Sequence, residues 1–187
     1  MTSPQDPVKT AEKTESTLKR KPKIFKQPPQ KRIFAVFMDY KNLDDGLPGG
    51  TRKFSDFSWL INPILEQGII AFAYVFIPDN YAGRAEIYQL SDKHDFLPIL
   101  CTRKTKNGIM KNGDTVDAKM EREAIKLIIH SDITDITIVS GDADFQGLIN
   151  FAIHNQKRVT VVPAAKACSE RFFEMAETGK IKLEVVR

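Results

Sequence analysis

The chain has 187 residues, of which 42% are hydrophobic, enough for one domain with a substantial core rather than a disordered polymer. Its longest nearly uninterrupted apolar run, residues 68–77, is shorter than the roughly 20 residues that a membrane-spanning helix needs. The two cysteines, Cys101 and Cys168, lie far apart in no metal-like spacing, which favours buried free thiols. No apolar segment follows the amino terminus, so we expect no signal peptide, no membrane partner and a cytoplasmic protein.

Residues 1–32 are strongly basic. They carry nine Lys or Arg against three Asp or Glu, a net charge of +6, whereas the whole chain has +4, so the remaining residues sum to −2. The segment is rich in Pro, Thr, Lys and Gln and poor in apolar residues, which predicts a disordered arm ahead of a domain at 33–187. Such arms often bind phosphate backbones, and a leader that only improves solubility is the equal alternative.

From residue 33 onward the sequence alternates short apolar runs with helical patterns. The apolar runs predict strands at 33–40, 69–78, 96–101, 136–140 and 158–163, with an additional sixth at 181–186. The helical patterns cover 54–68, 81–95, 116–130, 143–156 and 169–177. Gly68 is predicted to be a helix C-cap, and 43–50 and 103–115 are predicted to be loops. Apolar strands alternating with helices indicate an α/β fold around a mostly parallel sheet.

Four aspartates are expected at one edge of this sheet. Asp39 ends the first strand, Asp117 begins the helix before the fourth strand, and Asp142 and Asp144 follow the fourth strand. Ligands in such folds bind at the carboxyl ends of the strands, where these acids meet if strands one and four are neighbours. Two like charges ~4 Å apart repel by about 4 kcal/mol at an effective dielectric of 20, so the cluster is expected to hold a divalent cation or a proton. Oxygen ligands without nearby His or Cys favour Mg²⁺ or Mn²⁺ over zinc.

Each acid also has a purely structural interpretation. Asp142 fits a helix N-cap, Asp144 the positive end of a helix dipole, and Asp39 the start of a turn. Asp117, three residues after Asp114, resembles part of a capping box. The sequence has no G-x-x-x-x-G-K-[ST] loop, no G-x-G-x-x-G turn after the first strand and no serine elbow. A Toprim-type site stays open, although it expects a glutamate on the first strand.

Three sequence blocks resemble the signatures of a known family. FMDYKNL (37–43), VDAKMEREAI (116–125) and IVSGDADFQGLI (138–149) resemble, in family order, the motifs of the NYN domain, the LabA-like branch of the PIN-like nuclease superfamily. The resemblance implies a PIN-like three-layer fold with strand order 3-2-1-4-5. It implies as metal-binding and catalytic acids Asp39, Asp117, Asp142 and Asp144, with Asn42 as a polar site residue.

One position departs from the family pattern. Many relatives carry another aspartate six residues after the acid of the second block, where this chain has Glu123. Six residues on a helix correspond to a rotation of about 240°, so helix geometry alone favours Glu121, one turn after Asp117, as the side chain that faces the metal.

These features predict a metal-dependent nuclease, a ribonuclease of endo or exo type, in which bound Mg²⁺ or Mn²⁺ activates water. RNA is favoured over DNA by the resemblance alone. Substrate-binding residues are expected to be Asn42, Lys41, Arg103, Lys104 and Lys106, with Arg52, Lys53 and Lys111 on the same edge; solvated loop residues are the alternative. Tyr40 and Phe145 are candidates for stacking on bases, and a core role is simpler for Phe145.

Two other functions stay open at this point. One is an RNA-binding or regulatory module that kept the fold without useful catalysis, and the other is a phosphatase acting on small phosphate esters. Intact acids argue against the first, because a pure phosphate binder gains nothing from a negatively charged crevice. Assembly into a homodimer is also left open.

Overall fold

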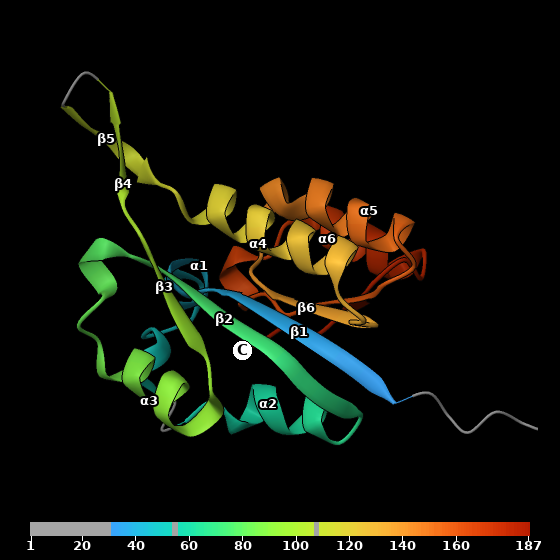
Figure 1. The fold of residues 1–187 in the computed structure, drawn as a ribbon. Coiled ribbons are helices and arrows are strands. Elements are labelled where there is room, and N and C mark those ends of the chain that lie inside the picture. Colours follow the sequence, from blue (N-terminus) through green and yellow to red (C-terminus); the bar gives the residue numbers. More distant parts are fainter. Residues whose placement is uncertain (1–30, 54–55, 107–108) are drawn as a thin grey trace, which may run out of the picture. The chain divides into compact units, whose positions relative to one another are not determined.

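The computed structural model describes residues 31–53, 56–106 and 109–187, and in this part of the chain six strands form one sheet (Figure 1). These strands are β1 Arg32–Asp39, β2 Gly68–Pro78, β3 Leu97–Cys101, β6 Asp135–Val139, β7 Arg158–Val161 and β8 Lys182–Leu183. Two further strands, β4 Arg103–Lys106 and β5 Ile109–Asp114, pair antiparallel as a separate hairpin between β3 and the next helix.

All neighbouring strands of the large sheet are parallel, in the order β3-β2-β1-β6-β7-β8. Numbered along the chain within this sheet, the order is 3-2-1-4-5-6. The predicted α/β class, the strand order and the additional sixth strand are therefore confirmed. The first and fourth strands, β1 and β6, lie side by side at the centre, with Met38 opposite Val139 at their carboxyl ends.

Helices cover both faces of the sheet, which makes the three layers (Figure 1). The helices are α1 Tyr40–Gly46, α2 Ser58–Leu65, α3 Ala85–His94, α4 Val116–His130, α5 Gln146–His154 and α6 Glu170–Glu177. Short 3₁₀ turns are η1 Thr51–Lys53, η2 Asp79–Tyr81, η3 Ala143–Phe145 and η4 Ala165–Ala167. The first three helices share one buried core with the sheet and the last three share the other.

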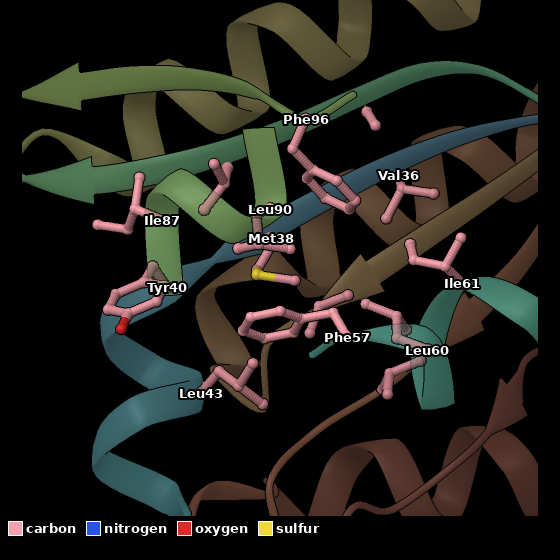
Figure 2. Packing of buried hydrophobic residues seen from close by; sticks show 14 of the residues in the cluster. Val36, Met38, Tyr40, Leu43, Phe57, Leu60, Ile61, Ile87, Leu90 and Phe96 are labelled. Atoms are coloured by element: carbon pink, nitrogen blue, oxygen red, sulfur yellow. The ribbon is translucent and has the colours of Figure 1, made fainter. Parts of the chain in front are cut away.

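The alternation of side chains along β1 explains the two cores. Phe34, Val36 and Met38 point into the core with α1, α2 and α3, whereas Ala35 and Phe37 point into the core with α4, α5 and α6. Figure 2 shows Met38 among Tyr40, Leu43 and Leu90 of the first core. A central strand that is buried on both faces is continuously apolar, and for this reason the sequence of β1 predicted a strand.

Three local predictions are wrong. Residues 103–115 are a hairpin rather than a loop; the Asn-Gly pair in the sequence between its strands is a typical hairpin signal, which the basic composition obscured. Gly68 starts β2 instead of capping a helix, and a Cβ there would lie 2.2 Å from the Arg32 carbonyl oxygen, so close strand approach requires glycine. Residues 40–46 form α1 directly after β1. The predicted arm at 1–32 falls almost wholly on residues 1–30, outside the described residues.

An ion cluster joins the amino-terminal ends of three strands. The Asp135 side chain of β6 is only 2% exposed and accepts hydrogen bonds from Arg158 Nε and Nη2 of β7 (2.8 and 2.7 Å) and Arg32 Nε of β1 (3.0 Å). Burial alone would raise the pKa of Asp135, but the bonds from Arg158, Arg32 and Thr134 hold it well below its ordinary value. This end of the sheet is thus fixed by paired charges.

Candidate functional site

A cavity of about 540 Å³ lies at the opposite, carboxyl-terminal edge of the sheet. Its walls come from the end of β1 and from α1, the start of α4, the turn after β6 and η4. The lining residues are Asp39, Lys41, Asn42, Asp45, Gly46, Val116, Asp117, Asp142, Lys166 and Ala167.

Three of the four predicted acids line this cavity, each from a different segment. Asp39 ends β1, Asp117 lies in the first turn of α4, and Asp142 is in the turn that follows β6. They come together because β1 and β6 are paired neighbours and α4 packs against β1. Asp144 is exposed on η3 and is not among the lining residues, although its N–H donates to Asp142 Oδ1 at 3.0 Å.

Two of these acids also cap helical turns. Asp39 is 6% exposed, and its Oδ1 accepts the N–H of Asn42 at 3.0 Å as the N-cap of α1. Asp142 caps η3 in the same way, through Asp144. A carboxylate has two oxygens, so capping through Oδ1 is compatible with a ligand role for the same side chain.

Asn42 connects the two central segments of the site. Its Oδ1 accepts the N–H of Gly141 at 2.8 Å, while its own N–H donates to Asp39. The end of β1 is thereby tied to the turn that carries Asp142. The sequence predicted Asn42 as a substrate-binding residue. In the structure its side-chain oxygen, Oδ1, is already hydrogen-bonded to the Gly141 N–H.

Two lysines line the cavity, and only one was predicted. Lys41 Nζ pairs with Asp45 Oδ2 at 2.5 Å, and this hydrogen bond raises the pKa of Lys41. Asp45 also accepts the Tyr81 hydroxyl at 3.3 Å. Lys166 on η4 was missed, although it follows the fifth strand at the carboxyl edge, where the strand-end rule that found Asp142 applies equally.

Arg52 is the one further predicted phosphate contact whose side chain the structure describes. Arg52 is exposed on η1 and does not line the cavity. For the remaining predicted cations the side chains lie outside what the structure describes, and only the backbone positions are known, on η1, β4 and β5: Lys53, Arg103, Lys104, Lys106 and Lys111.

Two glycines allow the η4 segment to close one wall. A Cβ at Gly141 would lie 1.9 Å from the Ala167 carbonyl oxygen, and a Cβ at Gly46 would lie 2.6 Å from the Cβ of Ala164. No real Cβ tolerates such approaches. Gly141, in the turn at residues 140–142 that follows β6 (the SGD turn), must therefore be glycine because the η4 segment packs against it. No pattern in the sequence predicted this contact.

The predicted base-stacking residues are buried. Tyr40 and Phe145 are both 0% exposed, and the Tyr40 hydroxyl hydrogen-bonds Thr51 Oγ1 at 2.7 Å. Burial raises the pKa of the Tyr40 hydroxyl. Base stacking is thus wrong for both rings, and the core role expected for Phe145 is correct. Neither Glu121 nor Glu123 lines the cavity, and Glu123 pairs with Lys126 at 2.8 Å.

The acids that line the cavity offer only oxygen atoms as donors to a metal ion. Among the described residues, no group of three or more His, Cys, Asp or Glu side chains has the arrangement of a metal site. Mg²⁺ usually takes one or two carboxylates together with waters and substrate phosphates, so the all-oxygen donors Asp39, Asp117 and Asp142 fit Mg²⁺ or Mn²⁺.

Comparison with known proteins decides the family. The model of the NYN domain matches residues 33–184. The chain belongs to the NYN domain family. The NYN domain is a PIN-like nuclease family, so the resemblance expected from the three motif blocks is confirmed.

The NYN fold is also found in a solved structure. The chain is similar to the crystal structure of VPA0982, a protein of unknown function from Vibrio parahaemolyticus RIMD 2210633, with a TM-score of 0.65 and 18% identity over 86% of this chain and 96% of that one. At this identity the likeness shows the fold alone. No curated protein sequence matches the chain. None of the helices in the described part of this NYN protein has the length and apolar character to cross a membrane.

Proposed function

We propose that this NYN protein is a Mg²⁺- or Mn²⁺-dependent ribonuclease that hydrolyses phosphodiester bonds at the carboxyl-edge cavity. The observation that carries the proposal is the meeting of three carboxylates, from β1, α4 and the turn after β6, in one cavity. Carboxylates repel a phosphate substrate unless a cation lies between them. Membership of a PIN-like nuclease family supports cleavage, and it is the sole ground for placing RNA before DNA.

The residues have separate roles in this proposal. Asp39, Asp117 and Asp142 would hold the cation, which supplies activation of water and polarisation of the phosphoryl oxygen when it is bound. Asn42 holds the turn with Asp142 against the end of β1, which keeps the carboxylates at a fixed separation. Gly141 and Gly46 let the η4 segment approach closely enough to form one wall of the cavity.

The test is incubation of the full chain with labelled RNA and DNA of one sequence, in Mg²⁺, Mn²⁺ or chelator. We expect cation-dependent RNA cleavage that Asp142→Asn lowers by about 100-fold or more, because loss of metal binding removes several kcal/mol of transition-state stabilisation. Asp132→Asn is the matched control, since Asp132 is exposed beside the amino end of β6. Cleavage that persists in chelator, or in Asp142→Asn, would refute the proposal.

A measurement without catalysis supports the same test. Mn²⁺ that binds the folded protein must raise its melting temperature by mass action. Asp142→Asn should remove most of that rise and Asp132→Asn should retain it. Asp144→Asn should reduce the Mn²⁺-induced rise in melting temperature less than Asp142→Asn does, because Asp144 does not line the cavity.

A binding module without catalysis is the second candidate. It is favoured by one observation, that the lysines Lys41 and Lys166 line the same cavity as the acids and could bind a phosphate without a cation. This candidate predicts RNA binding that is equal with and without divalent cation, and no cleavage in either.

A further inference from the structure

Lys166 and Lys41 line the same cavity but differ in what they contact. Lys41 is held by Asp45 at 2.5 Å. Lys166 has no ion pair with any described residue and is exposed on η4. An ammonium that already has a carboxylate partner must give it up before it binds phosphate. Lys166 is thus the cavity cation that is ready for an anionic ligand.

The backbone that carries Lys166 is fixed on both sides. Ala165 N–H donates to the Val186 carbonyl at 2.8 Å, and Ser169 N–H donates to the Gly141 carbonyl at 3.0 Å. The Gly141 contact joins η4 directly to the residue before Asp142. The missing Cβ of Gly141 allows this approach, so the position of Lys166 relative to the acids is built into the fold.

We propose that Lys166 binds a phosphate adjacent to the scissile one, which makes the cavity selective for polynucleotides over small phosphate esters. The inference rests on the proposed function, since it assigns the scissile phosphate to the acid wall. Lys166 lines the same cavity from η4, and a Lys ammonium is a mobile point charge suited to a backbone phosphate. A single phosphate ester has no second phosphate to offer it.

Binding tests the inference without any need for cleavage. The wild type, Lys166→Ala, Lys166→Arg and Lys180→Ala are titrated with a fluorescent single-stranded RNA in Ca²⁺ over a range of salt concentrations. Lys180 is a matched control, because it is exposed and precedes β8 at the amino-terminal edge of the sheet. Lys166→Ala should weaken binding about 10-fold, as for a charge-assisted hydrogen bond. It should also flatten the log-log salt dependence by about 0.7, the value for one phosphate contact on a single strand.

A purely structural role for Lys166 would change affinity without changing the salt slope. Lys166→Arg should retain both the affinity and the slope, and Lys180→Ala should match the wild type. Unchanged affinity and slope in Lys166→Ala, or a wild type that does not bind RNA, would overturn the inference.

Cleavage kinetics separate this inference from the proposed function. Lys166→Ala should raise KM for RNA about 10-fold with kcat unchanged, and should leave hydrolysis of bis(4-nitrophenyl) phosphate unaffected. Equal losses on both substrates would place Lys166 at the scissile phosphate and overturn the inference. If Asp142→Asn abolishes cleavage while Lys166→Ala changes nothing, the nuclease proposal stands and the role of Lys166 falls.

Discussion

Gly141→Ala should destabilise the protein by an amount that the structure bounds. The new Cβ would lie 1.9 Å from the Ala167 carbonyl oxygen and 2.9 Å from the Cα of Cys168. Both neighbours are backbone atoms, so no side-chain rotation relieves the clash, and η4 must move. Overpacking of this kind costs about 1–3 kcal/mol. At roughly 2–4 °C per kcal/mol for a chain of this size, the melting temperature should fall by about 2–12 °C.

A glycine-to-alanine substitution at Gly147, six residues later, should raise the stability of the protein instead of lowering it. Gly147 lies in α5, and a Cβ there would meet nothing within 4 Å. Alanine in a helix is favoured over glycine by about 0.5–1 kcal/mol, so Gly147→Ala should melt slightly above the wild type. Thermal unfolding of the three proteins, followed by circular dichroism, measures both differences under one condition.

The pair of substitutions makes the reasoning refutable. If Gly141→Ala melts within about 1 °C of the wild type while Gly147→Ala behaves as expected, η4 does not lie against the SGD turn. The wall of the cavity and the fixed position of Lys166 would then both be wrong. A variant that is destabilised yet retains its RNA affinity would show instead that the displaced wall takes no part in binding.

Other substitutions test the remaining parts of the structure. Asn42→Ala should cost about 1–3 kcal/mol in chemical denaturation by leaving the Gly141 N–H without its acceptor. Asp135→Asn should cost about 1.5–3 kcal/mol at neutral pH. The depressed pKa of Asp135 stabilises the fold above the unfolded value near 4, so this difference should narrow as pH falls below about 4. Deletion of residues 1–30 should flatten the salt dependence of RNA binding but leave turnover at saturating RNA unchanged.

The fold was predictable because its signals are local. Strands buried on both faces are continuously apolar, as in β1, and the helices between them carry ordinary periodicity, as in α4. The edge rule for parallel sheets, together with the strand order that the family resemblance implies, then brought Asp39, Asp117 and Asp142 together.

The features of the site that the sequence did not predict depend on contacts between segments that are distant along the chain. The hydrogen bond from the Gly141 N–H to Asn42 Oδ1 joins residues 99 positions apart, and no pattern within either segment predicts it. The packing of Ala167 on Gly141 is equally invisible, although it explains the glycine. Asp144 was predicted with the other acids from its place after the fourth strand and from the family resemblance; it is exposed on η3 and is not among the residues that line the cavity.

The helix caps at Asp39 and Asp142 do not by themselves explain why these residues are charged. Asn caps a helix about as well as Asp, so capping alone does not require a carboxylate at Asp39 or Asp142. Asp39 lines the cavity together with Asp117 and Asp142, so the charge of a carboxylate there bears on cation binding. Asp39→Asn should therefore keep the cap, leave the melting temperature without cation nearly unchanged, and remove the stabilisation by Mn²⁺. Equal melting of Asp39→Asn and wild type in both conditions would leave capping as the whole role of this acid.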